Sequence, residues 1–225
     1  SVSGGTGAYS YNWTPGNPPG DGTASVTGLT AGTWTCTVTD ANGCVATRTF
    51  NITQPPPLSV NTVSQTNVLC NGAATGAATV VAGGGLPAYT YNWTPGNPIG
   101  DGTATATSLT AGSWMCTVTD SRGCTNYRIF NITQPSAIVV TTLSQTNNTC
   151  NGGNNGAASI NPPSGGVGPY SYNWSPGNPI GDGTTAVTGL TAGTWTCTVT
   201  DFNACIVTQT FNITQPIAIT GSIGH

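Results

Sequence analysis

The sequence of 225 residues has no lysine and no glutamate, and charged residues make up only 4% of it. Three arginines stand against six aspartates, which gives a formal net charge of -3. Proteins that bind nucleic acid or anionic lipid need clusters of Lys and Arg. The composition therefore argues against both kinds of partner, and the lack of lysine excludes Lys–Asn isopeptide cross-links.

Long apolar runs and histidines are also scarce. No stretch of eighteen apolar residues exists, and the first residues lack the basic and apolar segments of a signal peptide. We expect no membrane insertion, and we interpret the chain as a mature or excised piece. The single histidine, His225, cannot supply a Ser-His-Asp or Cys-His set, and no turn carries paired carboxylates. The sequence thus predicts neither an enzyme nor a cofactor.

The chain contains one sequence block in three near-identical copies, at residues 11–44, 91–124 and 172–205. Near-identical units at a fixed period of about 80 residues indicate an array of stacked modules. Aligning the copies divides the chain into four parts. These are module one (1–54), module two (55–135), module three (136–216) and residues 217–225, the start of a further module or a linking strand.

Module one is expected to be incomplete. Ser1 aligns with Val81, so module one lacks its opening strand and the counterpart of residues 65–80, which includes a cysteine. An unpaired strand edge is a template for another chain. Because residues 217–225 match the opening of modules two and three, we expect neighbouring repeats, or copies of the chain itself, to continue head to tail.

Within each module the residue pattern is typical of β-strands. In the run TWTCTVTD, Trp34, Cys36 and Val38 alternate with threonines, which predicts one buried and one solvated face. The segment from Asp40 to Gly43 is typical of a hairpin turn, with Gly43 in a left-handed conformation. Six or seven short strands per module predict an all-β fold, a tandem array of immunoglobulin-like antiparallel β-sandwich repeats.

The aromatic residues could act as sugar-stacking platforms, but their positions favour a core. All six tryptophans fall on the apolar side of a predicted strand. Large aromatic side chains in such positions are usually buried. We therefore interpret the tryptophans as core residues.

Each full module has three cysteines, an odd number for a chain with the character of a secreted protein. A disulfide contributes roughly 2–4 kcal/mol to small extracellular domains. We favour the pairs Cys70–Cys124 and Cys150–Cys205, because a lone thiol at a hairpin end would be exposed. Cys44 is a further disulfide candidate whose partner would lie in the missing part of module one.

The remaining cysteines are predicted to be buried thiols. Cys36, Cys116 and Cys197 lie on the apolar side of their strands, where free cysteine packs like a small hydrophobe. A rival pairing joins Cys70 to Cys116, like an immunoglobulin inter-sheet bridge, and leaves Cys124 free or linking subunits. No metal is expected, since the C-x7-C spacing recurs without histidine.

The aspartates stand singly in turns. A calcium site needs roughly six to eight oxygen ligands, usually with more than one carboxylate, and each turn offers only one. We expect the aspartates to cap their own turns through Asx-type hydrogen bonds. They are Asp21, Asp101 and Asp182 in GDG turns, and Asp40, Asp120 and Asp201 in hairpin turns.

Asn-x-Ser/Thr sequons recur on the outward side of predicted strands. They are glycosylation candidates if the source organism modifies such sites, or chance products of a threonine-rich chain, which we favour. The candidates are Asn12, Asn51, Asn92, Asn131, Asn173 and Asn212.

The order of these features resembles the SprB-type repeat of surface adhesins from gliding Bacteroidota, which is similar in pattern to PKD-like domains. The shared pattern is a cysteine, then GGxxxYxYxW, a turn, LxAGxWxCxVTDxxGC and an ITQP exit. The chain departs from it at Trp34-x-Cys36, where an aromatic-x-Val is more usual, and in its longer TPGNPPGDG turn. In module two the pattern is carried by Cys70, Gly84, Gly85, Tyr89, Tyr91, Trp93, Leu109, Trp114, Cys116, Asp120, Cys124 and residues 132–135.

The resemblance implies PKD-like sandwiches displayed on the cell surface, exported by the type IX route, as part of a stalk or filament. We expect a structural, extracellular segment of an adhesin involved in attachment or gliding. One alternative is a multivalent array of carbohydrate-binding modules that holds surface polysaccharide, which aromatic side chains exposed in a groove would favour. Another is a self-assembling fibre subunit joined head to tail.

Overall fold

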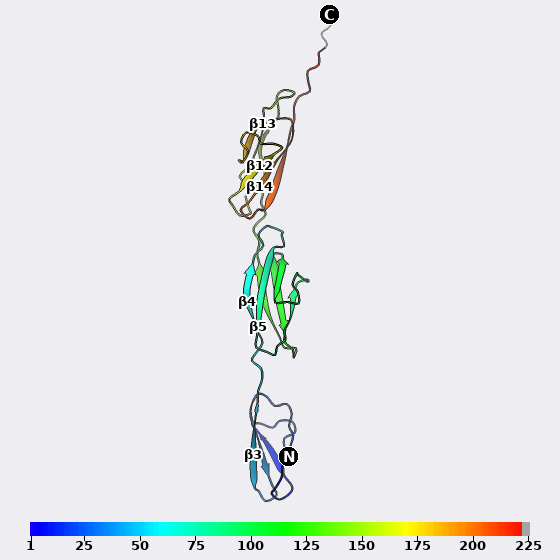
Figure 1. Ribbon diagram of the computed structural model, residues 1–225, viewed down its shortest axis with the longest axis vertical. Helices are drawn as coiled ribbons and strands as arrows, with labels where there is room; N and C mark the ends of the chain where they lie inside the picture. Colours follow the sequence, from blue (N-terminus) through cyan, green and yellow to red (C-terminus); the bar gives the residue numbers. More distant parts are fainter. Residues whose placement is uncertain (222–225) are drawn as a thin grey trace. The chain divides into compact units, whose positions relative to one another are not determined.

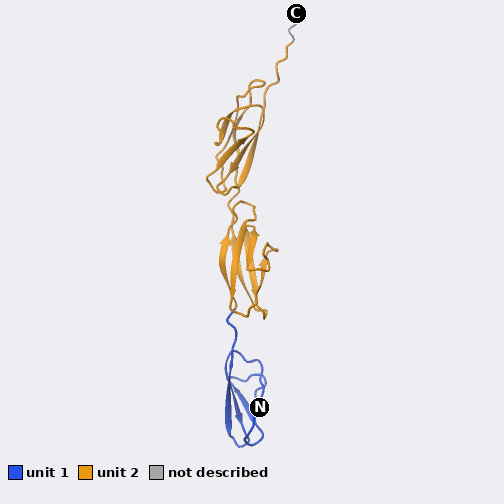
Figure 2. Ribbon diagram, in the orientation of Figure 1, with its two compact units in different colours: residues 1–57 blue, residues 58–225 orange. Residues whose placement is uncertain are grey.

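The computed structural model describes residues 1–221, which form strands and turns and no helix. A membrane-spanning helix is accordingly not found in this part of the chain. His225 and the rest of the tail beyond residue 221 lie outside the described residues. The chain divides into two compact units, Ser1–Pro57 and Leu58–His225 (Figure 2). The expected boundary between modules two and three falls inside unit 2, and the module limits stay a prediction.

Unit 1 is built on one three-stranded antiparallel sheet, in the order β1-β2-β3. The register opposes Trp13 to Cys36 and Trp34 to Phe50, so that apolar side chains gather on one face of the sheet. The alternation of apolar and threonine residues predicted this face. The strands are β1 (Ser10–Thr14), β2 (Gly32–Thr39) and β3 (Val45–Ile52).

Module two contains six strands in two three-stranded antiparallel sheets, in the orders β4-β5-β7 and β6-β8-β9 (Figure 1). Buried residues from both sheets form one hydrophobic cluster between them. The strands are β4 (Ser59–Thr66), β5 (Gly76–Gly83), β6 (Thr90–Thr94), β7 (Thr105–Leu109), β8 (Gly112–Thr119) and β9 (Thr125–Ile132).

Module three repeats this plan, with sheets β10-β11-β13 and β12-β14-β15 around a second hydrophobic cluster. The predicted fold class, an all-β array of immunoglobulin-like antiparallel sandwiches, is confirmed. The strands are β10 (Thr142–Thr146), β11 (Gly156–Ile160), β12 (Ser171–Ser175), β13 (Ala186–Leu190), β14 (Gly193–Thr200) and β15 (Ile206–Ile213).

The tryptophans lie in the cores, as predicted. Trp93 is 0% exposed, and its ring centroid lies 5.6 Å from that of Phe130. Its indole Nε1–H donates to Thr103 O (2.9 Å), so the one polar atom of the ring is satisfied. Trp174 repeats this arrangement against Phe211 in module three. Burial with a satisfied N–H is the environment of a structural tryptophan.

The apolar face of unit 1 has no second sheet over it within the described residues. In module two, β7 is held by pairing with β5, but most of the counterpart of β5 is absent from module one. Residues 25–29, the counterpart of β7, therefore form no strand. An open groove of about 570 Å³ lies over the face, lined by Trp13, Cys36, Phe50 and others. That module one is an incomplete copy of the repeat stays a prediction.

The hairpin turns adopt the conformation that the sequence predicted. Gly43 has a φ of 80°, and its counterpart Gly123 has 83°. In module three the same position is Ala204, with a φ of 63°. A left-handed alanine is sterically less favourable than glycine. In module three the turn conformation is therefore held by the hydrogen bonds of the surrounding hairpin and not by the preference of residue 204.

Candidate functional site at the junction of modules two and three

Two loops meet where module two ends and module three begins. The first is the opening loop of module two, residues 67–75, which follows β4 and lies against the exit segment of its own module. Asn71 Nδ2 donates to Pro135 O (3.0 Å), and Gly72 N–H donates to Gln134 Oε1 (2.8 Å). These hydrogen bonds fix the cysteine of the loop at the C-terminal end of module two.

The second loop is the hairpin between β14 and β15 of module three, residues 201–205. The buried Asp201 carboxylate organises it by accepting the N–H groups of Val167, Asn203 and Cys205, each at 2.9 Å. Burial alone would raise the pKa of Asp201, but the three N–H groups stabilise the charged form and hold the pKa below its ordinary value. The hairpin is thus rigidly presented by module three itself.

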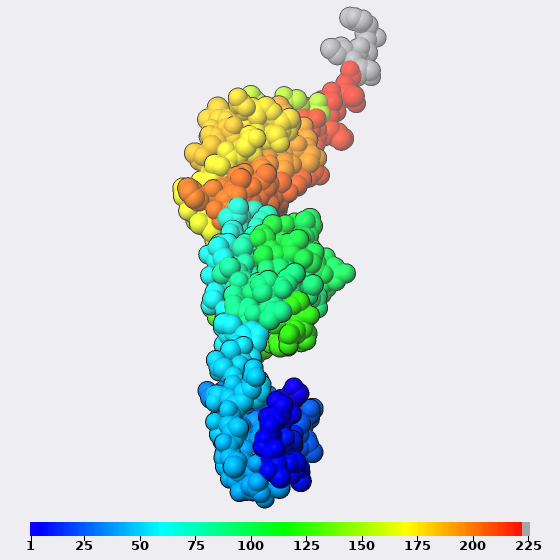
Figure 3. Space-filling model, turned by 60° about the horizontal axis from the view of Figure 1, so that its bottom comes forward, coloured from blue at the N-terminus to red at the C-terminus, as the bar shows by residue number. Residues whose placement is uncertain are grey.

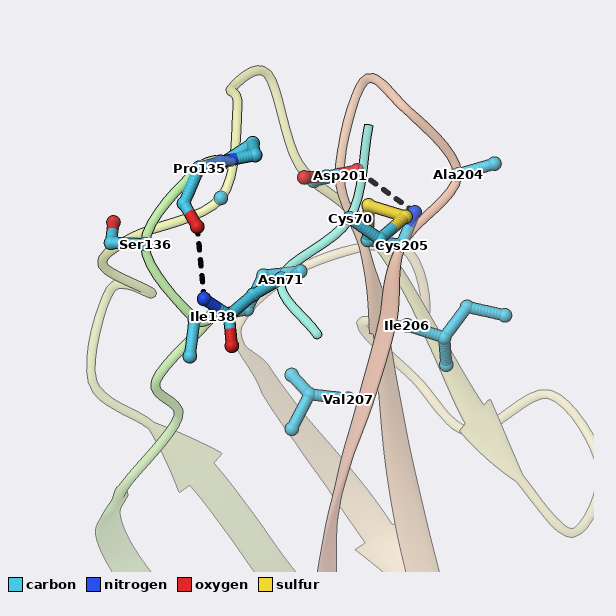
Figure 4. A pocket seen from close by; sticks show the side chains of 12 residues that line it. Cys70, Asn71, Pro135, Ser136, Ile138, Asp201, Ala204, Cys205, Ile206 and Val207 are labelled. Carbon is cyan, nitrogen blue, oxygen red and sulfur yellow. Dashed lines mark hydrogen bonds between the residues drawn. A yellow bond between two sulfur atoms is a disulfide. The ribbon is translucent and has the colours of Figure 1, made fainter. Parts of the chain in front are cut away.

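A disulfide between Cys70 and Cys205 joins the two loops (Figure 4), with the Cα atoms 5.6 Å apart. Beside it, Asn203 Nδ2 donates to Leu69 O (3.0 Å). Figure 3 shows the opening loop, in cyan, against the orange hairpin of module three. Modules two and three are therefore connected twice, by the backbone and by a disulfide that closes a sequence separation of 135 residues.

The backbone connection, which we call the linker (residues 135–138), also packs into module three. A Cβ added to Gly166 would lie 2.7 Å from Ile138 Cγ1 and 2.7 Å from Asp201 Oδ2, so Ile138 fills the corner between these residues. The N–H of Gly166 donates to Ser136 O (2.9 Å). A pocket of about 390 Å³ remains between the linker, the opening loop and the hairpin (Figure 4). Residues 1–221 hold no cluster of metal-ligating side chains, here or elsewhere.

The disulfide pairing expected from the sequence is wrong. Neither Cys70–Cys124 nor Cys150–Cys205 forms, and the rival Cys70–Cys116 does not form either. The bond instead runs from the opening loop of one module to the hairpin of the next.

The reason is that the two loops lie at opposite ends of a module. The hairpin of module two lies at its N-terminal end, where Asn126 Nδ2 donates to Leu58 O (2.7 Å). The eight residues of β4 separate this end from the opening loop, a distance of about 25 Å at ~3.3 Å per residue. Disulfide-bonded Cα atoms lie within about 7 Å of each other. The opening loop can therefore reach only a hairpin of the neighbouring module.

The six other cysteines are free and fall into two classes. Cys36, Cys116 and Cys197 are buried, where the sequence placed its core thiols. Burial, with a smaller contribution from a nearby aspartate, raises the pKa of Cys116 and of Cys197 to about 11. These thiols are inert at neutral pH because the thiolate is the reactive form. The exposed class comprises Cys44, Cys124 and Cys150.

The role predicted for the aspartates is right for one set and wrong for the other. Asp40, Asp120 and Asp201 do close Asx-type turns, as with Asp40 Oδ1 and the N–H of Asn42 (2.9 Å). The GDG aspartates do not cap their own turns. Asp101 Oδ1 accepts the N–H of Trp93 (2.7 Å), eight residues earlier, and thereby ties the loop to strand β6. The counterparts Asp21 and Asp182 do the same for Trp13 and Trp174.

The glycosylation candidates Asn12, Asn51, Asn92, Asn131, Asn173 and Asn212 are all exposed. Their modification stays a prediction. The residues that the sequence did not identify are the polar contacts of the junction, Asn71, Gln134 and Asn203. The odd number of cysteines per module was a signal that could have indicated a bond between modules, but the sequence analysis paired the cysteines within each module.

The hairpin aspartates make the fold sensitive to acid. Hydrogen bonds from the N–H groups of Leu86, Cys124 and Arg122 lower the pKa of Asp120, against the opposing effect of burial. A lowered folded-state pKa contributes stability above the unfolded value of about 3.9, and this stability is lost as pH falls through the folded pKa. Urea unfolding between pH 7 and 2 should therefore show a fall in stability below about pH 4. Asp120→Asn should flatten this fall, and an unchanged pH profile in the variant would contradict the assignment.

Comparison with known proteins gives two findings. The SprB repeat family model matches residues 62–98 and 142–179, which confirms the resemblance in modules two and three. No curated protein matches the chain.

Several solved structures are also similar to the chain. They include the N-terminal eight Ig domains of Down Syndrome Cell Adhesion Molecule, at 11% identity and a TM-score of 0.41, covering 92% of this chain and 33% of that one. The insect immune protein hemolin has 13% identity and a TM-score of 0.37, covering 92% and 67%. The human desmocollin-1 ectodomain has 13% identity and a TM-score of 0.28, covering 80% and 43%. The chain thus spans a third of the first of these structures.

Proposed function

We propose that this chain is a structural segment of a cell-surface adhesin. It would form part of a stalk or filament in which modules joined by disulfides bear tension and determine how far the protein extends during attachment or gliding. The observation that supports this most is the Cys70–Cys205 disulfide between two modules. A disulfide inside a module would stabilise that module alone. A disulfide between modules resists their separation when the chain is pulled, and it keeps the distance between them constant.

The disulfide also favours a location outside the cell. Structural disulfides form and persist in oxidising compartments and are rare in reducing cytosol. The SprB repeat matches point the same way, toward a surface adhesin. Export by the type IX route belongs to this proposal as well. Since charged residues make up only 4% of the chain, the spacing of such a stalk would be insensitive to salt.

The proposal has no catalytic component. The polar groups of the junction are engaged in hydrogen bonds or in the disulfide, and the buried thiols have raised pKa values. The alternative of a carbohydrate-binding array has less support. Sugar stacking needs exposed aromatic faces, whereas all six tryptophans are at most 9% exposed and serve the cores.

Surface display can be tested on the source organism. An antibody raised against this chain should label intact cells, and a strain without the segment should attach or move less well while its growth is unchanged. Labelling that requires cell lysis would overturn the proposed location. Normal attachment and motility in the deletion strain would overturn the proposed role.

A further inference from the structure

The outer face of the sheet β6-β8-β9 in module two carries a cluster of apolar side chains. Met115 on β8 lies directly opposite Ile129 on β9, and Tyr127 is the next residue of β9 on the same face. Side chains in these relative positions lie within roughly 8 Å of one another. We call these three residues, Met115, Tyr127 and Ile129, the outer patch.

The other two modules show that the fold does not require the outer patch. Both form the corresponding three-stranded sheet, in the orders β1-β2-β3 and β12-β14-β15. At all three positions of the patch they have threonine instead. The counterparts are Thr35, Thr47 and Thr49 in module one, and Thr196, Thr208 and Thr210 in module three. The apolar residues therefore serve module two in some way other than folding.

The outer patch faces solvent. Tyr127 is 58% exposed and Ile129 is 55% exposed, whereas Met115 is half-buried between its two neighbouring strands. Single exposed apolar side chains are ordinary on protein surfaces, but adjacent ones mark a site of contact. The outer patch is therefore a candidate binding surface.

Its size argues for a small ligand. A fully exposed aromatic side chain offers about 150–250 Å², so the exposed halves of Tyr127 and Ile129 with part of Met115 offer roughly 200–300 Å². A stable protein interface takes about 800 Å² from each partner. The outer patch is thus too small to hold a second copy of the chain or another protein by itself.

Polar groups that can hydrogen-bond border the aromatic ring. Thr117 lies directly opposite Tyr127, and Asn92 lies opposite Thr117 on the next strand, which places the three residues in one row across the sheet. Asn92 is exposed and Thr117 is half-buried, so an amide and a hydroxyl group lie on the same face as the tyrosine. Both groups donate and accept hydrogen bonds, as the hydroxyl groups of a sugar require.

The outer face is uncharged within the described part of the chain. Strands β6, β8 and β9 contain one charged residue, Arg128. The alternation of side chains places Arg128 on the opposite side from Tyr127, and its Nε donates to Thr62 Oγ1 (2.8 Å) of the other sheet. An anionic ligand would find no ion pair on the outer face. The patch therefore fits a neutral ligand.

We propose that the outer patch binds a neutral polysaccharide, with a pyranose ring stacked on Tyr127 and its hydroxyl groups bonded to Thr117 and Asn92. The C–H face of a pyranose suits the negative face of an aromatic ring, and its hydroxyl groups lie at the rim. Ile129 and Met115 continue the apolar contact along the sugar chain. This is one site in one module, in contrast to a repeated binding array, and it adds a ligand to the structural role proposed above.

The test is native electrophoresis of the purified chain through gels that contain hydroxyethyl cellulose, laminarin or dextran. At least one of these neutral polymers should retard the unmodified chain. Tyr127→Ala should raise the apparent Kd about tenfold or more, because the stacking surface is lost, and Tyr127→Phe should bind as the unmodified chain does. If none of the three polymers retards the chain, the proposal is wrong.

Phe202→Ala is the matched control for the loss of an exposed aromatic side chain. Phe202 is 72% exposed in the hairpin of module three, outside the outer patch. Its truncation should leave the retardation unchanged, and urea unfolding should show that both alanine variants remain folded. An equal loss of binding in Phe202→Ala and Tyr127→Ala would mean that the polymers adhere to any exposed apolar group, which contradicts a site on module two.

Module three allows the site to be built a second time. Thr196→Met, Thr208→Tyr and Thr210→Ile together would place an outer patch beside Asn173 and Thr198, the counterparts of Asn92 and Thr117. This triple variant should restore binding to a chain that carries Tyr127→Ala. A failure to restore it, with the variant folded, would refute the assignment of the site to these three residues.

Sedimentation velocity distinguishes sugar binding from self-association. The unmodified chain should show no dimer that Tyr127→Ala abolishes. Such a dimer, without retardation by any polymer, would replace the proposal by a protein contact. Because both assays use purified chain, their failure would leave the proposed cell-surface role standing.

Discussion

Pulled from its two ends, the oxidised chain should extend about 450–490 Å less than the reduced chain when all modules have unfolded. The Cys70–Cys205 disulfide closes a sequence separation of 135 residues, and each residue inside it would otherwise add ~3.3–3.6 Å. Force spectroscopy on single molecules measures this difference directly. The length that the disulfide keeps from extending, the locked length, should be a single increment, since one bond encloses most of module two and most of module three.

The same measurement separates the observed bond from the alternatives. Two disulfides inside modules, at Cys70–Cys124 and Cys150–Cys205, would hide two loops of about 55 residues each, which is about 360–400 Å in all. Cys205→Ser should release the full locked length. Cys124→Ser removes an exposed hairpin cysteine that forms no bond in the structure, so its locked length should equal that of the unmodified chain.

The largest loss of stability is expected from Trp93→Ala. Truncation of a fully buried tryptophan leaves a cavity in module two, and the cost should be about 3–5 kcal/mol. The variant also leaves Thr103 O without its indole donor. Urea unfolding followed by the fluorescence of the remaining tryptophans should show module two unfolding at a lower urea concentration.

Tyr127→Ala provides the comparison for this variant within the same module. Tyr127 lies on β9 but is 58% exposed, so its truncation should change the free energy of unfolding by about 0.5 kcal/mol or less. If Trp93→Ala kept the midpoint of the unmodified chain but lost adhesion to a glycan surface, the tryptophan would be a binding residue and its role in the core would be refuted.

Much of each module could be predicted because its signals are local. The alternation around Trp34, Cys36 and Val38 fixes which side chains face the core, since successive side chains of a strand point to opposite faces. The hairpin at Asp40 to Gly43 follows from the turn preference of its own residues. These properties depend on neighbours within a few positions, and the same residues recur in each of the three copies of the repeated block.

The role of the GDG aspartates could not be predicted in this way. Asp101 bonds to Trp93, eight residues away, and this contact depends on how the intervening loop folds back over β6. A carboxylate in a turn can accept a hydrogen bond from its own turn or from a strand several residues away, and the sequence pattern favours the first. The three-dimensional path of the loop decides between them.

The sequence by itself determined the all-β strand pattern of the repeated block and the buried tryptophans. It could not determine the partner of Cys70. In an array of near-identical modules, Cys124 and Cys205 stand at equivalent positions, so no local pattern tells them apart. Only the tertiary structure decided, because β4 carries the opening loop to the far end of its own module, where the hairpin within reach of a disulfide belongs to the next module.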